Sequence, residues 1–359
     1  MSNLISDMNV GRLLAIFALL INQSVYALAG ECLERTWEGT VGGLPVTMRF
    51  ETIYPDDKLA GRYYYSENVN DLLLMPLGEQ SGRWAEIDPM GRQTGVLTLS
   101  CTEARLSGEW KSGDGRRRLP VLARARAGLD YQARRMAALR WSVLAVPEPN
   151  GEGRDLLQPF GLEALGVTGL RLHGHSVGVR TINAKLMAEF RDAVQVALEC
   201  RTTGRLTQGE GHTYENRRTW SVETRNRGFV VVVQTSSDFC GQAHPYLDVE
   251  HTVFEASRGE IVRMADWLSE PYQDELGPKS ELGKLLHGLY RHGGDASCFE
   301  EIAFTTSDMW PSESGLHFRT IAPYESRRCI ETFLLPFDSV WPYLSSIGKV
   351  ASKAFVVQH

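Results

Sequence analysis

The stretch FVVVVQTSSDFCGQAHPYLDVEH, residues 229–251, decides how the second half of this 359-residue chain folds. Its run of β-branched residues predicts a strand, which ends in Ser and Asp turn signals. Cys240 and His244 follow, four residues apart. Three interpretations are open at this turn: a thiol nucleophile with its base, a metal site, or a turn in a sheet that disulfides hold together.

The residues around this stretch predict an α+β domain over 165–359, with an antiparallel sheet and two or three packed helices. Helices are expected where apolar residues recur at helical spacing or follow a capping residue; these stretches are 182–199, 281–292 and 339–355. Strands are expected over 218–226, 228–237, 315–323 and 329–337, with a hairpin around residues 257–259. The mixture of both periods favours the α+β class over an all-β or all-α fold.

Residues 30–125 predict a different, β-rich domain. Short stretches of strand character alternate there with Gly- and Asp-containing turns, a pattern typical of an antiparallel meander curled into a half-barrel or small barrel. Alternation along VTMRF (residues 46–50) predicts one buried and one wet face. Residues 126–164, punctuated by Arg and Pro, are expected to connect the two domains.

The N-terminal residues 1–29 have the character of a signal peptide. RLLAIFALLI (residues 12–21) is an apolar run after one arginine, and Ala27-Leu28-Ala29 fits a small-x-small cleavage site. The run is shorter than the roughly 20 apolar residues that a membrane-spanning helix needs. With Met1 or Met8 as the start, we expect an exported protein, periplasmic or secreted, with no membrane span after cleavage.

Export changes the meaning of the cysteines, because disulfides persist in oxidising compartments. The chain has 6 cysteines, all after the expected cleavage: Cys32, Cys101, Cys200, Cys240, Cys298 and Cys329. An even number predicts three disulfides, and proximity along the chain favours pairing them in sequence order. A disulfide at Cys240 favours the structural interpretation of the 240–244 turn, since a thiol nucleophile must be free.

The formal net charge of −6 is distributed unevenly. Residues 104–140 carry ten Lys or Arg and three acids, whereas residues 236–345 carry 18 acids and eight bases. The basic segment is expected to be solvated or packed on the neighbouring domain. No basic motif interleaved with aromatic residues accompanies it, so no nucleic-acid partner is expected. The acidic half favours a cationic protein partner.

The order of motifs after residue 165 resembles a known family. Over about residues 165–355 the chain resembles the C-terminal domain of lysozyme-sensing anti-sigma factors of the RsiV type and of some polysaccharide deacetylases of the PdaC type. The Gly-Gly-Ala-His-Pro turn of that family corresponds to residues 241–245 here, where Gln242 replaces the second glycine. Asp266-Trp267-Leu268 stands for a short helix, and Leu335-Pro336-Phe337 matches the last motif. The resemblance implies an extracytoplasmic, non-catalytic module.

Candidate binding residues lie in the turn that carries this motif: Gln242, His244, Pro245 and Tyr246. Cys240 with His244 is the candidate for nucleophilic catalysis, and Ser176 in GHSVG (residues 174–178) resembles a hydrolase elbow without the parallel βα pattern that an elbow needs. His173 and His175 are a close histidine pair, but no third or fourth metal ligand accompanies them. Neither a P-loop nor a dinucleotide fingerprint is present, so no cofactor and no metal is expected.

The function expected from the sequence is therefore that of an exported, disulfide-bonded, non-catalytic binding protein of the cell envelope. The expected ligand is a lysozyme-like protein or a cell-wall polysaccharide. The alternative is an envelope hydrolase or esterase that acts on wall glycan or on esters.

Overall fold

The computed structural model describes residues 35–53, 58–78, 82–144, 157–208, 214–242, 244–273, 276–290 and 298–355. The signal-peptide prediction and Cys32 lie outside these residues. The chain divides into two compact units, the first formed by residues 1–140 and 198–214 and the second by 141–197 and 215–359. Each unit is described by itself.

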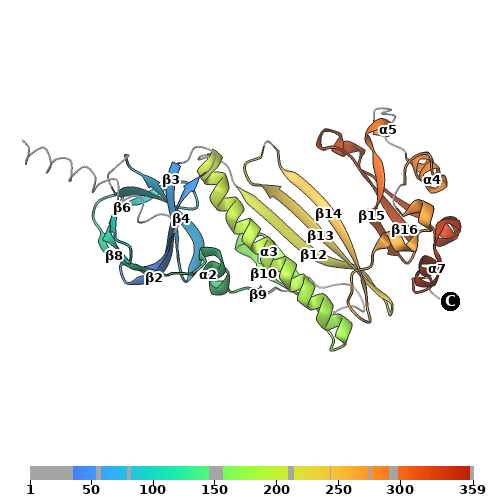
Figure 1. Cartoon of the computed structure of the whole chain (residues 1–359), viewed down its shortest axis with the longest axis horizontal. Helices are drawn as coiled ribbons and strands as arrows, with labels where there is room; N and C mark the ends of the chain where they lie inside the picture. The colour runs from blue at the N-terminus through green and yellow to red at the C-terminus, as the bar shows by residue number, and fades with distance from the viewer. Residues whose placement is uncertain are drawn as a thin grey trace, which may run out of the picture. The chain divides into compact units, whose positions relative to one another are not determined.

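The first unit contains a closed barrel of eight antiparallel strands (Figure 1). The strands are β1 (Thr36–Val41), β2 (Leu44–Ile53), β3 (Lys58–Tyr65), β4 (Asn68–Pro76), β5 (Arg83–Ile87), β6 (Gln93–Cys101), β7 (Arg105–Ser112) and β8 (Arg118–Ala125). Each strand pairs with the next, and β1 also pairs with β8, which closes the barrel. The predicted meander is confirmed, and it closes completely because both edge strands satisfy their backbone groups on each other.

Alternation along β2 places Val46, Met48 and Phe50 in the barrel interior, as expected. Thr47 is also buried, although it points outward. The short helix α2 (Tyr131–Ala138) packs over this part of the barrel, where the Tyr131 and Tyr64 ring centroids are 5.3 Å apart. Residues of the arginine-rich segment therefore cover part of the barrel, and the outer side of β2 is only partly exposed to solvent.

A buried ionic cluster lies on the outside of the barrel in the first unit. Arg135 Nη1 is 2.9 Å from Asp71 Oδ2, and the two side chains are 1% and 2% exposed. Tyr131 donates to Asp71 Oδ1 and Thr202 donates to Asp71 Oδ2, each over 2.7 Å. Arg62 lies 3.8 Å from the same carboxylate. We call these five residues the Asp71 cluster; its hydrogen bonds satisfy charges that would otherwise be costly to bury.

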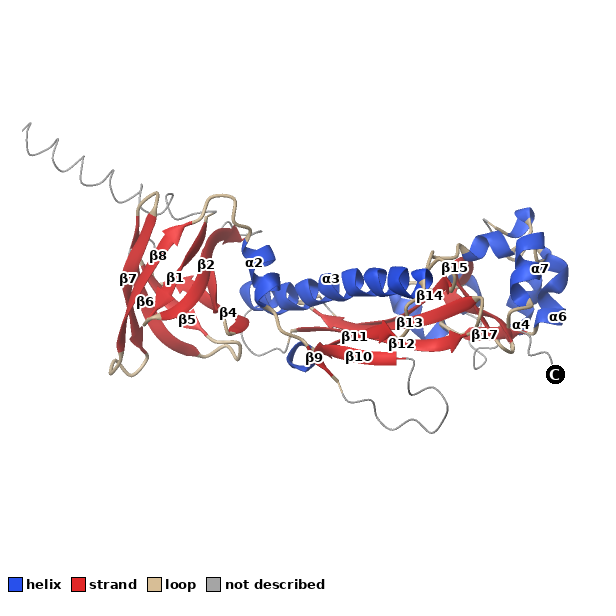
Figure 2. Ribbon diagram, turned by 90° about the horizontal axis from the view of Figure 1, so that it is seen from below, coloured by secondary structure: helices blue, strands red, loops and turns tan. Residues whose placement is uncertain are grey.

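The second unit is built on a six-stranded sheet with the strand order β14-β13-β12-β11-β10-β9. Its strands are β9 (Ser142–Val143), β10 (Leu157–Leu162), β11 (Val167–Leu172), β12 (Glu215–Arg225), β13 (Phe229–Phe239) and β14 (Tyr246–Glu255). The helix α3 (Val177–Gln208) runs along one face of this sheet (Figure 2). The predicted α+β class is confirmed.

One pairing in this sheet is parallel, whereas the sequence predicted antiparallel pairing throughout. Strands β11 and β12 run in the same direction because α3 connects them. A parallel connection needs a crossover of a dozen residues or more, and a helix is the usual solution. The sheet is therefore mixed.

Helix α3 is longer than the predicted helix over 182–199. It begins at Val177 because the Ser176 side chain accepts a hydrogen bond from the Val179 backbone amide over 3.2 Å. Serine is a strong N-cap, and this capping outweighs the weak helix propensity of the residues that follow.

A second, three-stranded sheet has the order β15 (Ala303–Ser312), β16 (Gly315–Ile321) and β17 (Thr332–Leu335). Short helices accompany it: η3 (Met264–Trp267), η4 (Glu270–Tyr272), α4 (Glu281–Leu289), α5 (Cys298–Glu301), η5 (Tyr324–Cys329), α6 (Phe337–Val340), η6 (Trp341–Tyr343) and α7 (Ser346–Ser352). Ser280 caps α4, as predicted. A single core buries the apolar residues of these elements.

The predicted C-terminal helix over 339–355 is interrupted. Leu344 is extended and forms a β-bridge with Leu268, so α6 and η6 end before α7 begins. Ser345 then starts α7 by accepting from the Gly348 amide. The tertiary contact at Leu344 breaks the helix, although the helical pattern is continuous in the sequence.

Disulfides are present, which indicates an oxidising, extracytoplasmic setting. Cys298 and Cys329 are joined, with Cα atoms 5.5 Å apart, as proximity along the chain favoured. Cys101, Cys200 and Cys240 are also disulfide-bonded, so no cysteine of the described residues is a free thiol. The other two predicted pairings stay predictions.

Among the described residues, no helix combines the length and the apolar character that a membrane crossing demands.

Candidate functional site

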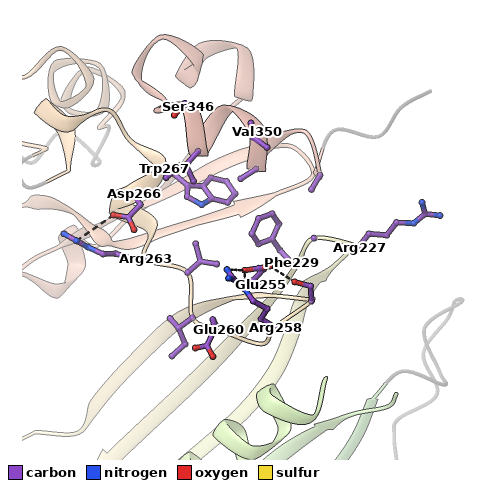
Figure 3. A pocket seen from close by; sticks show the side chains of 17 residues that line it. Arg227, Phe229, Glu255, Arg258, Glu260, Arg263, Asp266, Trp267, Ser346 and Val350 are labelled. Atoms are coloured by element: carbon purple, nitrogen blue, oxygen red, sulfur yellow. Dashed lines mark hydrogen bonds and ion pairs between the residues drawn. The ribbon is translucent and has the colours of Figure 1, made fainter. Parts of the chain in front are cut away.

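The second unit has a cleft of about 800 Å³ between the turn that follows β14 and helix α7 (Figure 3). Its walls come from residues 255–263, from η3 and from α7. Small-molecule and peptide-side-chain sites commonly have volumes of roughly 300–1,000 Å³. The cleft is therefore large enough to hold several side chains of a partner.

The floor of the cleft is aromatic. Phe229 and Trp267 line it, with ring centroids 5.4 Å apart in an edge-to-face arrangement. Phe355 supports both rings, stacked on Phe229 at 5.3 Å and 6.1 Å from Trp267. Trp267 and Phe355 are buried, so this floor is rigid.

Three large apolar side chains stand exposed around the cleft. Ile261 is 55% exposed, and Ile347 and Val350 on α7 are 60% and 69% exposed. Grouped exposed apolar side chains are unusual on a folded domain, unlike single ones, and often mark an interaction site.

A close backbone contact fixes the α7 wall. Gly348 lies against η3, and a Cβ atom at this position would stand 2.1 Å from the Trp267 carbonyl oxygen. The Ser345 amide donates to the same carbonyl over 2.8 Å. Glycine thus permits the approach that places Ile347 and Val350 beside the aromatic floor.

The charged side chains at the rim are arranged in pairs. Lys185 is 3.0 Å from Glu260, and Arg263 is 3.8 Å from Asp266. Arg258 and Glu255 form a third pair. The hydrogen bond from Ser257 to Glu255 lowers the pKa of this carboxyl most, and Arg258 lowers it further. In Figure 3 the Arg227 side chain extends away from the other labelled side chains. Because these pairs neutralise one another, the apolar surface dominates the cleft.

A smaller cavity of about 530 Å³ lies on the other side of residues 261–263, and His251 lines it. His251 Nε2 is 3.1 Å from Glu223 Oε2, and Trp310 Nε1 donates to Glu223 Oε1 over 3.2 Å. The imidazole stacks on the Trp310 ring, with centroids 3.5 Å apart, and His317 stacks on the same ring at 5.1 Å.

Burial lowers the pKa of His251 to about 4, and positive Arg319 and His317 act in the same direction. The Glu223 carboxylate acts in the opposite direction, because it favours a protonated ring. With burial the larger effect, the ring is neutral at pH 7, and its Nε2–H donates to Glu223. This hydrogen bond fixes the ring in the wall of the smaller cavity, and the Nε2 atom of the neighbouring His317 lies 2.9 Å from Ser312 Oγ.

Glu223 reaches this position because of an irregularity in the sheet. Val222 pairs with Val232 and Thr224 pairs with Val231, so Glu223 has no partner across the ladder. Such bulges redirect a side chain and are common beside functional sites.

The residues predicted for binding do not lie in the cleft. Gln242, His244, Pro245 and Tyr246 are exposed, and none of them lines it. Gln242 closes its own turn: its side chain accepts from the Cys240 amide over 2.6 Å and donates to Asp238 Oδ1 over 2.7 Å. Tyr246 stacks under the guanidinium of Arg327 at 4.2 Å. A binding role for this turn stays a prediction.

The other sequence candidates have structural roles. Cys240 is disulfide-bonded and is therefore no thiolate nucleophile. Ser176 caps α3 and lies in the loop between β11 and this helix; because β11 and β12 are parallel, the expectation that no parallel βα pattern surrounds this serine is wrong. His173 and His175 lie in the loop between β11 and α3. Within the described ranges, no group of three or more potential ligands could hold a metal ion.

The sequence did not identify the cleft residues. Ile347 and Val350 belong to an apolar pattern that also includes Ala351 and Phe355, so they are expected to be core residues. Only the three-dimensional position of α7 shows which side of that pattern is exposed. One cleft residue, Trp267, did belong to a motif of the family resemblance. That motif predicted a short helix but no binding role for the tryptophan.

No protein family and no curated protein matches this sequence at a significant level. Two solved structures are similar to part of the chain. A DUF3298 family protein from Pseudomonas aeruginosa PAO1 covers 58% of this chain and 95% of its own length, with 13% identity and a TM-score of 0.35. A DUF3298 family member from Bacteroides fragilis covers 61% and 97%, with 12% identity and a TM-score of 0.37. The DUF3298 type is related to domains of the RsiV and PdaC type. At these TM-scores the structural similarity does not indicate the function of this chain.

Proposed function

We propose that this protein is a non-catalytic binding protein of the cell envelope, periplasmic or secreted, whose cleft captures a lysozyme-like protein. The observation that carries the proposal is the group of exposed apolar side chains, Ile261, Ile347 and Val350, around an aromatic floor. Such a surface suits the apolar side chains of a protein partner, because burying them releases water from both sides.

Charge favours a cationic partner. Residues 236–345, which contribute much of the second unit, carry 18 acids and eight bases. The excess of acids over this range attracts a basic protein at long distance and accelerates the encounter, while the apolar cleft, whose rim charges are paired, supplies most of the affinity. A wall polysaccharide fits this cleft less well, because sugar recognition relies on exposed aromatic faces and many unpaired polar groups.

The test is a binding measurement by surface plasmon resonance with the oxidised protein immobilised. Purified lysozyme is the probe, cytochrome c is the control for charge alone, and soluble wall-glycan fragments represent the other ligand class. We expect lysozyme to bind, and Ile347→Lys and Val350→Lys to weaken it by about tenfold or more, since each places a cation in the contact. Both positions are exposed, so the substitutions should leave the fold intact.

The matched control is Val143→Lys, which changes an exposed apolar residue of the same unit outside the cleft. It should leave lysozyme binding unchanged. Equal binding of cytochrome c, or equal loss in the Val143→Lys variant, would show that attraction is unspecific. Retention of glycan fragments without lysozyme would reject the protein ligand.

A further inference from the structure

A separate cavity of about 670 Å³ lies in the second unit between strands β10 and β11 and the first turns of α3. It shares no lining residue with the cleft beside α7. None of its lining residues is acidic. In a protein with a net charge of −6, this composition is a local reversal of sign.

Four cationic or proton-donating side chains line the cavity: Arg171, His173, His175 and Arg180. All four are exposed. Arg180 Nη1 donates to the His175 carbonyl, which holds this guanidinium beside the loop, and no carboxylate of the described residues is paired with either arginine. Guanidinium groups bind carboxylate and phosphate through paired hydrogen bonds. An imidazole offers at least one N–H donor in either protonation state. These four groups are suited to a single anionic head.

The remaining wall of the cavity is largely apolar. Phe160, Leu170, Leu172 and Met187 contribute to it. Phe160 is held by an edge-to-face contact with Phe190, whose centroid is 4.7 Å away. Phe160, Leu170 and Leu172 are almost fully buried and form the closed base of the cavity, so Met187 and Ala184 carry its open apolar surface. A small inorganic anion would leave this surface in water, whereas an alkyl chain would cover it.

The frame of the cavity is held rigidly. The Asn183 side chain accepts from the Leu172 amide over 2.8 Å and donates to the Leu172 carbonyl over 2.9 Å, which joins α3 to the end of β11. Arg225 donates to the His173 carbonyl over 3.3 Å. These bonds fix the loop that carries both histidines, so a ligand would find the donors already in position.

From these observations we infer that this cavity binds an anionic amphiphile, a molecule with one carboxylate or phosphate head and an apolar tail. Arg171 and Arg180 bind the head, with His173 and His175 as additional donors. Met187 and Ala184 contact the tail above the buried base of the cavity. The site is independent of the cleft that captures the protein partner.

The test uses isothermal titration of the full, oxidised protein with four probes kept below their micelle concentrations. Lauric acid and dodecyl phosphate carry both parts of the expected ligand, dodecanol carries only the tail, and inorganic phosphate only the head. We expect the first two to bind about tenfold or more tightly than the last two. The tighter of the two identifies the head group.

Arg171→Gln/Arg180→Gln is the variant that tests the head contacts. Both side chains are exposed, so the fold should be kept. We expect its affinity for the two anionic amphiphiles to fall by about tenfold or more, with dodecanol unaffected. Arg217→Gln, at an exposed arginine of the same unit that lines neither this cavity nor the cleft, is the control and should bind the amphiphiles like the parent protein.

Dodecanol binding as tightly as lauric acid and dodecyl phosphate would overturn the inference, because the cavity would then be apolar only. Unchanged affinity in Arg171→Gln/Arg180→Gln would also overturn it. The same holds if neither amphiphile binds at its highest monomeric concentration.

Discussion

At the scale of the residue, Asp71 is the central carboxylate of the buried cluster on the outer surface of the barrel. Its two oxygens accept from Tyr131 and Thr202 and face Arg135, and both charged side chains are almost fully buried. Removing one member of a buried ion pair leaves the other charge uncompensated, whereas removing both is tolerated much better. The cluster therefore acts as a unit.

We predict that Asp71→Asn destabilises the first unit by about 3 kcal/mol, because the buried Arg135 loses its nearest counter-charge, whereas Arg62 keeps Glu51 and Glu199, each 3.0 Å away. Glu109→Gln, at an exposed pair with Arg118 3.4 Å away, should change stability by less than about 0.5 kcal/mol. Hydrogen exchange of barrel peptides, followed by mass spectrometry, measures the effect on this unit alone.

A double-mutant cycle measures the interaction energy between Asp71 and Arg135 separately from the other effects of each substitution. In Asp71→Asn/Arg135→Gln the loss should be smaller than the sum of the two single losses, since each single change strands the other charge. Additive losses would contradict a coupled cluster.

At the scale of the element, helix α7 illustrates what the sequence does and does not determine. Ser280 and Ser345 each precede a short helix and accept from the amide three residues later, and the Ser280 cap was predicted from the sequence alone. The end of the preceding helix was not, because the Leu268–Leu344 bridge brings together residues far apart in the chain. Local signals such as caps and strand alternation are readable; a break imposed by a distant strand is not.

The same distinction explains the candidate site. The antiparallel meander follows from alternation and turns between neighbouring strands, so the sequence predicted it, whereas the closure of the barrel pairs β1 with β8, which are far apart in the chain. The cleft depends on which side of α7 faces η3, and Gly348 alone decides that approach. The sequence contains this glycine, but it does not predict that the Trp267 carbonyl packs against it.

Two glycines in short helices make a matched prediction about packing. Gly348→Ala should destabilise the second unit by about 1–3 kcal/mol, since its Cβ would meet the Trp267 carbonyl and displace α7. Gly288→Ala in α4 should stabilise it by about 0.5–1 kcal/mol, because nothing lies within 4 Å of the new methyl group and alanine favours the helix. Urea unfolding followed by circular dichroism compares the two, and equal signs would contradict the assigned contact.

At the scale of the whole molecule, the disulfides link stability to the compartment. The Cys298–Cys329 bond closes a loop with a sequence separation of 31 residues. A loop of this length corresponds to about 3–4 kcal/mol of stabilisation in the chain-entropy account. We predict that Cys298→Ser/Cys329→Ser lowers the stability of the second unit by this amount, measured by urea unfolding under oxidising conditions. A loss below about 1 kcal/mol would mean that the surrounding core holds these segments without the bond.

The stability of the second unit should also depend on pH through its buried imidazoles. Burial lowers the pKa of His251 to about 4, and it lowers the pKa of His317 and of His287 as well. In the unfolded chain each imidazole titrates near pH 6.5. Between these values the unfolded chain binds protons that the folded chain does not, so stability falls as pH decreases from about 6.5 to about 4.

For His251 we expect the loss over this range to be on the order of 1 kcal/mol, since the Glu223 carboxylate and solvent screening oppose the effect of burial. His251→Gln keeps a donor towards Glu223 but cannot titrate, so it should flatten this part of the profile. Urea unfolding at pH values from 4 to 7 measures the two profiles. A His251→Gln profile as steep as that of the parent protein would show that Glu223 balances burial and that His251 titrates near its ordinary value. The smaller cavity would then be lined by a ring that charges in mildly acidic surroundings.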